Sequence, residues 1–323
     1  MSAIPGFASR MKLDVPFLQL PLAFDHAVLA AEVAAIAESE WRPHPQGYAG
    51  NTALPLVSVD GDPANDAVRG PMRPTPHLAA LPYLNQVLHA IGAVWGRTRL
   101  MRLSGQAEVA EHVDVSYYWR EHMRVHVPIV TQPTVRFICG GSEMNMAAGE
   151  CWIFDTWRRH RVINDDHRSR IHLVADTVGG RHFWPLFRAG KPHDKPAAGW
   201  APKAVPPTPG SYPLEFESFN VPDVMSPWEL REHLAFLFGE TAPGDAARAL
   251  WGGVMVPFAR EWQALWAMHG DRGGGLAEYR QLRDQVMPHL SRFDNLAMRN
   301  GVPLTEALRT LVMASLVAAD AGC

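Results

Sequence analysis

Charged and apolar residues alternate along two segments in the middle of the chain, with the two-residue period of a strand that has one face in a core. In residues 124–130, Arg124 and His126 share one face, and the valines and isoleucine between them share the other. Arg170 and His172 repeat this arrangement at the start of the second segment. The sequence therefore predicts two strands that each turn a basic pair toward the same side.

Toward the N-terminus, apolar residues recur with the longer period of an amphipathic helix. Asp25 is placed to cap a helix that runs to about Trp41, because apolar residues recur at helical spacing after it. A second helix is predicted over residues 84–94. Residues 42–76 between them are rich in Pro, Gly, Asn and Asp, which predicts a loop with short strands around 54–59.

A proline-rich stretch and a run of helices follow the strands. Residues 189–213 contain seven prolines, which predicts an extended linker or a wrapping arm. Ser226, Pro227 and Glu229 then have the spacing of a helix start, with Ser226 as N-cap and Glu229 placed for a capping box. Further helices are predicted around 258–268, 279–287 and 304–319.

These patterns indicate an α+β protein with three parts. Residues 1–188 are expected to form a double-stranded β-helix (a cupin-like jelly roll) with flanking N-terminal helices, 189–225 a linker, and 226–323 a helical domain. Trp262 and Trp266 lie four residues apart on one face of a predicted helix. We expect both to fill the core of the helical domain rather than to line a ligand site.

Composition excludes several classes of protein. With 323 residues, 47% of them hydrophobic, the chain can bury a large core, and a net charge of -3 gives no general attraction to nucleic acid or to a membrane surface. The three cysteines Cys139, Cys151 and Cys323 form no even disulfide framework, so reduced thiols are expected. Residues 1–20 lack the apolar run of a signal peptide, which favours a cytoplasmic location.

Candidate metal ligands lie close to the basic strands. His112 and Asp114 are two residues apart, so on a strand both side chains would share a face. His160 follows the apolar run 152–155, a predicted strand of the same core. Because the chain has fifteen histidines, an H-x-D triplet alone is weak evidence for a metal site. Two imidazoles and one carboxylate are nevertheless the set that holds non-heme Fe(II) and leaves positions open for O2.

The inward basic residues predict an anionic ligand near this metal. Buried arginine is costly without a partner, and its planar fork matches a carboxylate. 2-Oxoglutarate fits both demands, because its 2-oxo acid end chelates iron while its far carboxylate can reach Arg170. Arg124 and His126 are further candidate contacts. The alternative is structural: an internal salt bridge of Arg170 to Asp176 or Asp114.

Taken together, these residues resemble the catalytic core of the aspartyl/asparaginyl β-hydroxylase family, whose relatives include the bacterial proline cis-hydroxylases. The resemblance rests on His112-x-Asp114, Arg124-x-His126, Gly149–Asp155, His160, Asn164, Arg170 and Leu173–Asp176. Asp114 makes the chain more similar to the proline hydroxylases than to the animal enzymes, which lack this carboxylate. The strand 100–103 has no serine where some relatives contact the cosubstrate.

The resemblance implies an Fe(II)/2-oxoglutarate-dependent dioxygenase with O2 as cosubstrate and succinate and CO2 as co-products. It implies metal ligation by His112, Asp114 and His160, and 2-oxoglutarate binding by Arg124, His126 and Arg170. The implied reaction is hydroxylation of a side-chain carbon of an amino acid, free or in a peptide, with aspartate, asparagine or proline as suitable residues.

Substrate contacts are predicted near the H-x-D triplet and the second histidine. The candidates, each weighed against simple exposure to solvent, are Tyr118, Arg120, His122, Arg158 and Arg159. Two other functions stay open from the residues alone. A His/His/Asp set also binds zinc in hydrolases, and a jelly roll can keep a metal site as a non-catalytic sensor.

Overall fold

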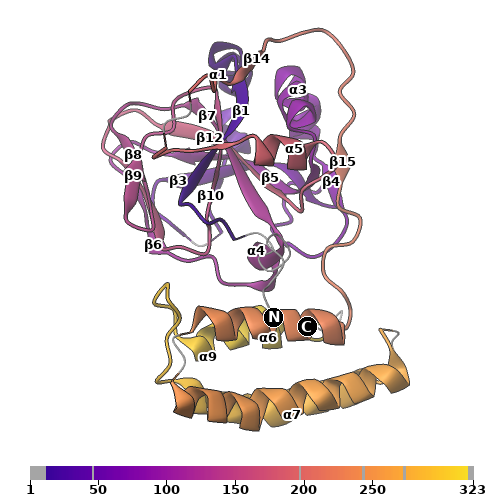
Figure 1. Ribbon diagram of the computed structural model, residues 1–323. Coiled ribbons are helices and arrows are strands. Elements are labelled where there is room, and N and C mark those ends of the chain that lie inside the picture. The colour runs from indigo at the N-terminus through magenta and orange to yellow at the C-terminus, as the bar shows by residue number, and fades with distance from the viewer. Residues whose placement is uncertain (1–11, 46, 196–197, 242–243, 272–273, 319–323) are drawn as a thin grey trace. The chain divides into compact units, whose positions relative to one another are not determined.

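The chain folds into two compact units, each described by itself (Figure 1). The computed structural model describes residues 12–318 except 46, 196–197, 242–243 and 272–273. Of these, 12–112 and 121–220 form the sheet unit, and 113–120 and 221–318 form the helical unit. Cys323 and residues 1–11 of the N-terminal stretch that was expected to lack a signal peptide lie outside the described residues. Among the described residues, no helix combines the length and apolar character needed to cross a membrane.

Two sheets make up the sheet unit. The large sheet has the strand order β13-β1-β10-β7-β12-β5-β3-β2, with β14 beside β1, β15 beside β5 and β4 beside β3, and the small sheet has the order β6-β11-β8-β9. The strands are β1 (Phe17–Phe24), β2 (Arg42–Pro43), β3 (Asn51–Val59), β4 (Met72–Pro74), β5 (Val94–Leu103), β6 (Glu108–His112), β7 (Met123–Val130), β8 (Val135–Cys139), β9 (Ser142–Met144), β10 (Glu150–Phe154), β11 (His160–Asn164), β12 (Arg170–Thr177), β13 (Lys191–Pro192), β14 (Lys203–Val205) and β15 (Glu215–Phe216).

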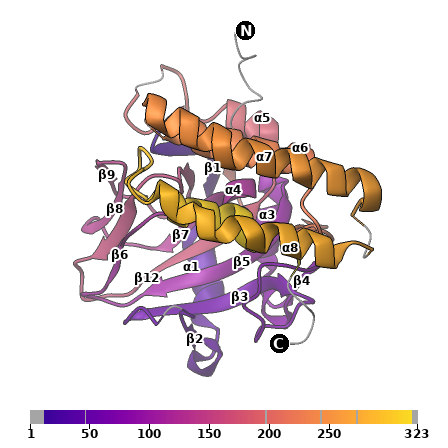
Figure 2. The ribbon, with the colours of Figure 1, turned by 90° about the horizontal axis from the view of Figure 1, so that it is seen from below.

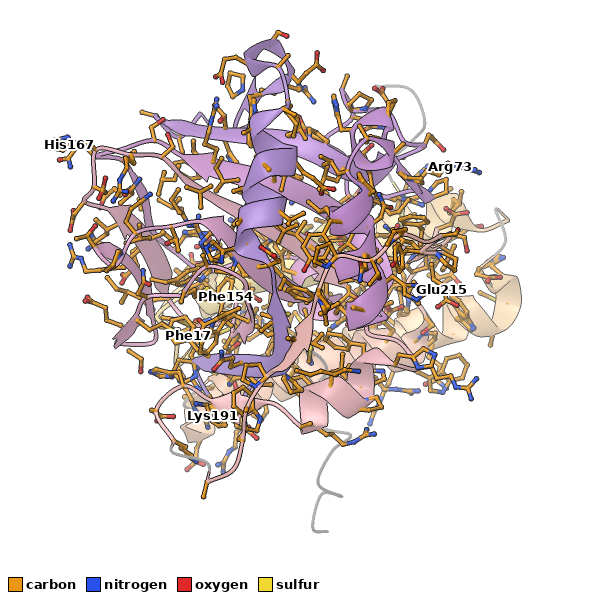
Figure 3. All side chains as sticks on the ribbon, turned by 90° about the horizontal axis from the view of Figure 1, so that it is seen from above. Phe17, Arg73, Phe154, His167, Lys191 and Glu215 are labelled. Carbon is orange, nitrogen blue, oxygen red and sulfur yellow. The ribbon has the colours of Figure 1, made fainter. Side chains whose placement is uncertain are left out.

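An apolar core fills the space between the two sheets. Phe17 and Phe154, which lie opposite each other on β1 and β10 and are labelled in Figure 3, contribute from the large sheet. Phe137 on β8 contributes from the small sheet, with its ring centroid 4.8 Å from that of Phe154. Two largely antiparallel sheets packed over one core are the arrangement of a jelly roll. The predicted α+β fold with a double-stranded β-helix core is therefore confirmed.

Three helices, α1 (His26–Ala34), α2 (Pro76–Ala79) and α3 (Pro82–Ile91), belong to the sheet unit, and α1 packs on β7. This contact explains why most side chains of β7 are buried on both faces of the strand. Asp25 caps α1 as predicted, since its carboxylate accepts from the N–H groups of Ala27 and Val28. The helix ends at Ala34, however, well before the expected Trp41, which follows a separate short turn at Glu38–Glu40.

Tertiary contacts explain why the helices of the sheet unit end where they do. Glu32 on α1 accepts from the backbone N–H groups of Tyr83 and Leu84, so α1 and the start of α3 are joined by a side-chain cap. Gly92 ends α3 in the left-handed region with φ 66°, and a Cβ there would meet Cβ of His182 at 2.6 Å. Val94, expected at the end of this helix, is instead the first residue of β5.

The strand structure expected around 54–59 within the predicted loop 42–76 is present, and it is longer than expected. β3 covers nine residues and pairs with β5 along most of its length. Pro55 lies inside this strand, and the register shifts between Pro55 and Val57, which accommodates a residue that has no N–H to donate. Thr75 Oγ1 donates to the carbonyl of Pro55. Proline and the polar flanks made the strand look shorter in the sequence than it is.

The proline-rich stretch after β12 lies along the large sheet as an arm. A short helix α5 (Phe183–Arg188) precedes it. β13 pairs antiparallel with β1, and β14 pairs parallel with the same strand. β15 pairs parallel with β5. Each pairing covers two or three residues, because proline supplies no donor to a longer ladder.

The helical unit contains α6 (Pro227–Glu240), α7 (Asp245–His269), α8 (Leu276–Val286) and α9 (Leu304–Ala307), with 3-10 and π turns at Met287–Phe293 and Leu308–Ser315 (Figure 2). Ser226 caps α6 as predicted by accepting from the N–H of Glu229. Trp262 is fully buried and donates to the carbonyl of Met225, as a core residue does. Trp266 is only half-buried, so the expectation that both tryptophans fill the core was right for Trp262 alone.

Candidate metal centre and anion cluster

Two histidines face each other across adjacent strands of the small sheet. β6 and β11 pair antiparallel with His112 directly opposite His160, so both side chains leave the sheet on the same face. Their ring centroids lie 4.2 Å apart. Residues separated by 48 positions in the sequence are thus brought into contact by strand register alone.

Backbone carbonyls fix the tautomer of both rings. His112 Nδ1 lies 2.8 Å from the carbonyl oxygen of Ala110, and His160 Nδ1 lies 2.9 Å from that of Arg158. A carbonyl oxygen only accepts, so Nδ1 carries the proton in each neutral ring and Nε2 carries the lone pair. A histidine that binds a metal through Nε2 is typically oriented by such a bond from Nδ1.

Asp114 completes a group of three metal-binding side chains. β6 ends at His112, so Asp114 follows the strand rather than belonging to it, which differs from the expected geometry. One ligand atom from each of His112, Asp114 and His160 nevertheless lies within 4.8 Å of the others. Two imidazoles with Nε2 lone pairs and one carboxylate fit Fe(II), which prefers this donor set. The same donors also fit zinc.

A second group, which we call the anion cluster, consists of His126 on β7 and Arg170 and His172 on β12. Arg170 Nη2 lies 2.7 Å from His172 Nδ1, and His126 Nδ1 lies 3.4 Å from the same atom. All three side chains are almost fully buried. The sequence predicted His126 and Arg170 as site residues, and the structure brings them together with His172, which was not among the predicted site residues.

Burial governs the protonation of the anion cluster. It lowers the pKa of Arg170 to about 9, so the guanidinium stays charged at neutral pH. It also holds the pKa values of His126 and His172 well below 6.5, and the charge of Arg170 adds to this effect. Both imidazoles are therefore neutral at neutral pH. The cluster carries one positive charge, held by Arg170.

No carboxylate of the described residues pairs with that charge. Asp176, the alternative partner considered for Arg170, instead accepts from Arg124 Nε at 3.0 Å, and Arg97 Nε lies 3.9 Å from its other oxygen. His126 Nε2, Arg170 Nε and His172 Nε2 are buried and have no hydrogen-bond partner among the described residues. Three polar atoms left in this state indicate a ligand, since buried polar groups are almost always paired.

Phe154 lies between the two groups. Its ring centroid is 4.8 Å from that of His160 and 5.3 Å from that of His126. Phe137 contacts both Phe154 and His126. The candidate metal ligand His160 and the anion cluster therefore contact the same apolar side chains. An apolar surrounding strengthens any electrostatic interaction formed beside it.

Arg124 is placed differently from the other predicted anion contacts. It lies on the same face of β7 as His126, as the alternation predicts, and its charge contributes to the lowered pKa of His126. Its guanidinium is engaged by Asp176, which is 1% exposed. The structure thus joins Arg124 to an internal ion pair at the edge of the anion cluster.

The five predicted substrate residues have different surroundings. His122 Nε2 forms a buried pair with Glu217 at 2.5 Å, and Arg158 Nε donates to Asp155 at 2.9 Å. Arg159 is exposed and lies 3.5 Å from Glu111. The other two, Arg120 and Tyr118, are buried on α4 (Tyr117–Glu121), where Arg120 stacks on Phe236 and Tyr118 packs against Trp119.

One pattern in the sequence could have identified His172. The R-x-H spacing of Arg170 and His172 repeats that of Arg124 and His126, and the pairing of β7 with β12 places all four residues on one face. The alternation predicted both strands, but only Arg124, His126 and Arg170 were expected to belong to the site. The pairing of β7 with β12 shows that His172 lies beside them.

The fold and these two groups define a class of protein: a jelly roll with a two-histidine, one-carboxylate metal site. Residues 64–179 match the model of the family described as aspartyl/asparaginyl beta-hydroxylase, and this range contains every residue of both groups. Over this range, about a third of its length, the chain is similar to the aspartyl/asparaginyl β-hydroxylase family.

One curated relative is similar to less than half of the chain. L-proline cis-3-hydroxylase 1 of Streptomyces sp is 24% identical over 147 residues, which cover 43% of this chain and 50% of the relative. The chain thus spans half the length of this curated relative.

Two solved structures show partial likeness. An oxidoreductase of the 2OG-Fe(II) oxygenase family from Burkholderia pseudomallei has 14% identity and a TM-score of 0.36, covering 49% of this chain and 80% of that one. A prolyl-4-hydroxylase of Pseudomonas putida has 15% identity and a TM-score of 0.33, covering 52% of this chain and 94% of that one.

Proposed function

We propose that this protein is an Fe(II)/2-oxoglutarate-dependent dioxygenase that hydroxylates a side-chain carbon of an amino acid, free or within a peptide. The observation that carries the proposal is the presence of two different groups beside the same apolar side chains. One group offers a carboxylate and two imidazoles whose Nδ1 atoms donate to backbone carbonyls, which places the lone pair on Nε2. The other is a buried cation without a carboxylate partner among the described residues.

The three metal-binding side chains would hold Fe(II). His112 and His160 bind through Nε2, because the carbonyls of Ala110 and Arg158 keep the proton on Nδ1. Asp114 supplies the negative charge that an Fe(II) site of this type uses. When bound, iron together with 2-oxoglutarate and O2 supplies the oxidising power for hydroxylation, with succinate and CO2 as co-products.

The anion cluster would bind 2-oxoglutarate. Arg170 provides a charged, planar donor for the carboxylate far from the metal, and its burial makes an ion pair there strong. His126 stands next to it on the neighbouring strand. Arg124, held by Asp176, adds positive charge to the same face and is the third proposed contact to the cosubstrate. Phe137 and Phe154 exclude water from the space beside these residues.

The proposed substrate class follows from the family and from the relatives' names. The family is described by aspartyl and asparaginyl residues, and the curated relative is named after L-proline. Tyr118, Arg120, His122, Arg158 and Arg159 remain the proposed substrate contacts. His122 and Arg158 are the weaker candidates, because each already has an internal partner. A substrate would have to replace Glu217 at His122 or Asp155 at Arg158.

Succinate formation tests the proposal. The purified protein is incubated with Fe(II), 2-oxoglutarate, O2 and single amino acids or short peptides, with aspartate, asparagine and proline first. We expect succinate in an amount equal to the hydroxylated product. Replacement of Fe(II) by Zn(II) should stop the reaction. Hydrolysis supported by Zn(II) would establish the hydrolase alternative, and ligand binding without succinate for any substrate would favour the sensor.

A further inference from the structure

A short turn between β10 and β11 leads directly to the candidate metal ligand His160. The turn covers residues 155–159, and Asp155, its first residue, is 0% exposed. A carboxylate is rarely buried to this degree unless other groups pair with it. Asp155 belongs neither to the candidate metal centre nor to the anion cluster, so its burial requires another explanation.

The carboxylate of Asp155 holds this turn from inside. Its Oδ1 accepts from the backbone N–H of Trp157 at 3.2 Å, and its Oδ2 accepts from Arg158 Nε at 2.9 Å. The backbone carbonyl of Asp155 accepts from the N–H of Arg158 at 3.1 Å. Burial raises the pKa of Asp155 to about 6, and the guanidinium of Arg158 acts against this shift. The carboxylate is therefore mainly in its charged form at neutral pH.

The side chain of Arg158 is fixed by further contacts. Its Nη2 donates to the backbone carbonyl of Asp14 at 3.2 Å. Its stem lies beside Gly140, the residue after β8, which has a φ of 55° and where a Cβ would meet Cδ of Arg158 at 2.8 Å. The guanidinium is thus bonded on two sides, and the stem occupies space that a side chain at position 140 would need.

The backbone of Arg158 links this turn to the metal site. Its carbonyl oxygen is the atom that accepts from Nδ1 of His160 at 2.9 Å. The next carbonyl, that of Arg159, accepts from the N–H of Gly140 at 2.9 Å, where β11 begins to pair with β8. The peptide group between Arg158 and Arg159 therefore lies between two fixed points. These are the carboxylate of Asp155 on one side and the strand ladder on the other.

We propose that Asp155 is a positioning residue for the metal site: its carboxylate holds Arg158 in the turn, and the Arg158 carbonyl thereby keeps the lone pair of His160 Nε2 directed at the metal. This inference rests on the metal site of the proposed function. It also explains why Arg158 is one of the weaker candidates for a substrate contact. Loss of an outer hydrogen-bond partner of a metal-binding histidine typically lowers metal affinity or activity by about 10- to 100-fold.

Two substitutions remove the two halves of the pair. Asp155→Asn has nearly the same size and can still accept from the N–H of Trp157, but it removes the charge that holds Arg158. Arg158→Met keeps an apolar stem and removes the guanidinium. Neither substitution changes the backbone carbonyl that accepts from His160, so any effect on the metal site must come from the position of that carbonyl.

Asp166→Asn is the matched control. Asp166 pairs with Arg168 in the turn that follows β11, with Nε of the arginine 3.0 Å from Oδ1 of the aspartate. The carbonyl of Arg168 accepts from the side chain of Asn164 rather than from a histidine. The control thus breaks an aspartate–arginine pair in a neighbouring turn that does not orient a candidate metal ligand.

Metal binding is measured without substrate and without O2, so that no turnover is needed. The full-length metal-free protein is titrated with Co(II), whose visible d–d absorption depends on the number and geometry of its ligands. Fe(II) affinity is obtained by competition with Co(II). Circular dichroism and thermal denaturation of the metal-free variants report separately on folding and stability.

The expected result is a loss confined to the metal. Asp155→Asn and Arg158→Met should each raise the dissociation constant of Co(II) by about tenfold and change the shape of the d–d spectrum. The double variant should lose little more than either single variant, because both act through one contact. Asp166→Asn should keep the affinity and spectrum of the wild type. The dissociation constant of 2-oxoglutarate for the Fe(II)-loaded variants should stay near that of the wild type, because the anion cluster is unchanged.

Several results would overturn the role of Asp155. Wild-type affinity and spectrum in Asp155→Asn would do so, and so would equal losses in Asp155→Asn and Asp166→Asn, which would show a general effect on stability. A loss in Asp155→Asn that Arg158→Met does not share overturns the route through Arg158. If Asp155→Asn does not fold, Arg158→Met decides by the same two readouts.

Failure of the proposed function gives a different result. A wild type that binds Co(II) and Fe(II) but shows no visible chelate band with 2-oxoglutarate would end the dioxygenase assignment, while the variants would still decide the role of Asp155 in metal binding. A wild type that binds neither metal would overturn both.

Discussion

The histidines of the candidate metal centre and His172 of the anion cluster use the same side chain in opposite ways. His112 and His160 each have a backbone carbonyl as the partner of Nδ1, so their Nε2 atoms carry lone pairs suited to a cation. His172 has a guanidinium as the partner of Nδ1, so its Nε2 carries a proton suited to an anion. The group that contacts Nδ1 thus decides which kind of ligand each ring can bind.

Loss of a metal ligand should give the largest effect. His160→Ala removes an imidazole from the metal group, and we expect 2-oxoglutarate turnover to fall on the order of a thousandfold or more, because metal-assisted chemistry supplies several kcal/mol. The measurement is succinate formation at saturating Fe(II). His167→Ala is the control, since His167 is an exposed histidine at the edge of the sheet unit (Figure 3). Equal activity of the two variants would remove His160 from the metal site.

Loss of the arginine should affect the cosubstrate rather than the metal. Arg170→Ala should raise KM for 2-oxoglutarate on the order of a hundredfold, the effect of truncating one partner of a buried charge pair. Fe(II) affinity should stay near that of the wild type. Arg136→Ala is the control, because Arg136 is exposed and paired with Asp165. A variant that loses Fe(II) affinity but keeps its KM would contradict the division between the two groups.

The ion pair beside the anion cluster should contribute to stability. Arg124→Ala leaves the buried carboxylate of Asp176 with only the longer contact to Arg97, and we expect the free energy of unfolding to fall by about 3 kcal/mol. Removing the exposed partner in Arg159→Ala should cost less than about 1 kcal/mol. Urea denaturation measures both. Equal and small losses would show that the Arg124 pair is solvated in solution.

The smallest predicted effect is a dependence of stability on pH. His126 and His172 have pKa values held well below 6.5 in the folded state, so below pH 6.5 the unfolded chain binds protons that the folded chain does not. Their contribution to stability is complete above pH 6.5 and is lost as pH falls toward their folded pKa values, by up to about 1.4 kcal/mol per pH unit for each ring.

Urea denaturation between pH 7 and pH 5 tests this sign. The slope of unfolding free energy against pH should be smaller in His172→Asn, which has no titrating ring at this position. A slope that is unchanged by the substitution would mean that His172 titrates normally in the folded protein.

The difference between the two groups also explains which parts could be predicted. The strands β7 and β12 were predicted because their alternation is regular, and the residues of the metal group because their side-chain chemistry is specific. Only part of β3 was predicted, around 54–59, because Pro55 interrupts its pattern, and α1 ends at Ala34, before the apolar spacing that predicted a longer helix ends. His172 required the register of β12 and the position of Arg170.

The most direct test is a crystal structure of the protein grown without O2 with Fe(II) and 2-oxoglutarate. We predict iron bonded to Nε2 of His112 and His160 and to Asp114, with the far carboxylate of 2-oxoglutarate hydrogen-bonded to Arg170. Iron bonded through Nδ1 of either histidine, or a cosubstrate whose far carboxylate lies away from Arg170, would contradict the division of roles between the candidate metal centre and the anion cluster.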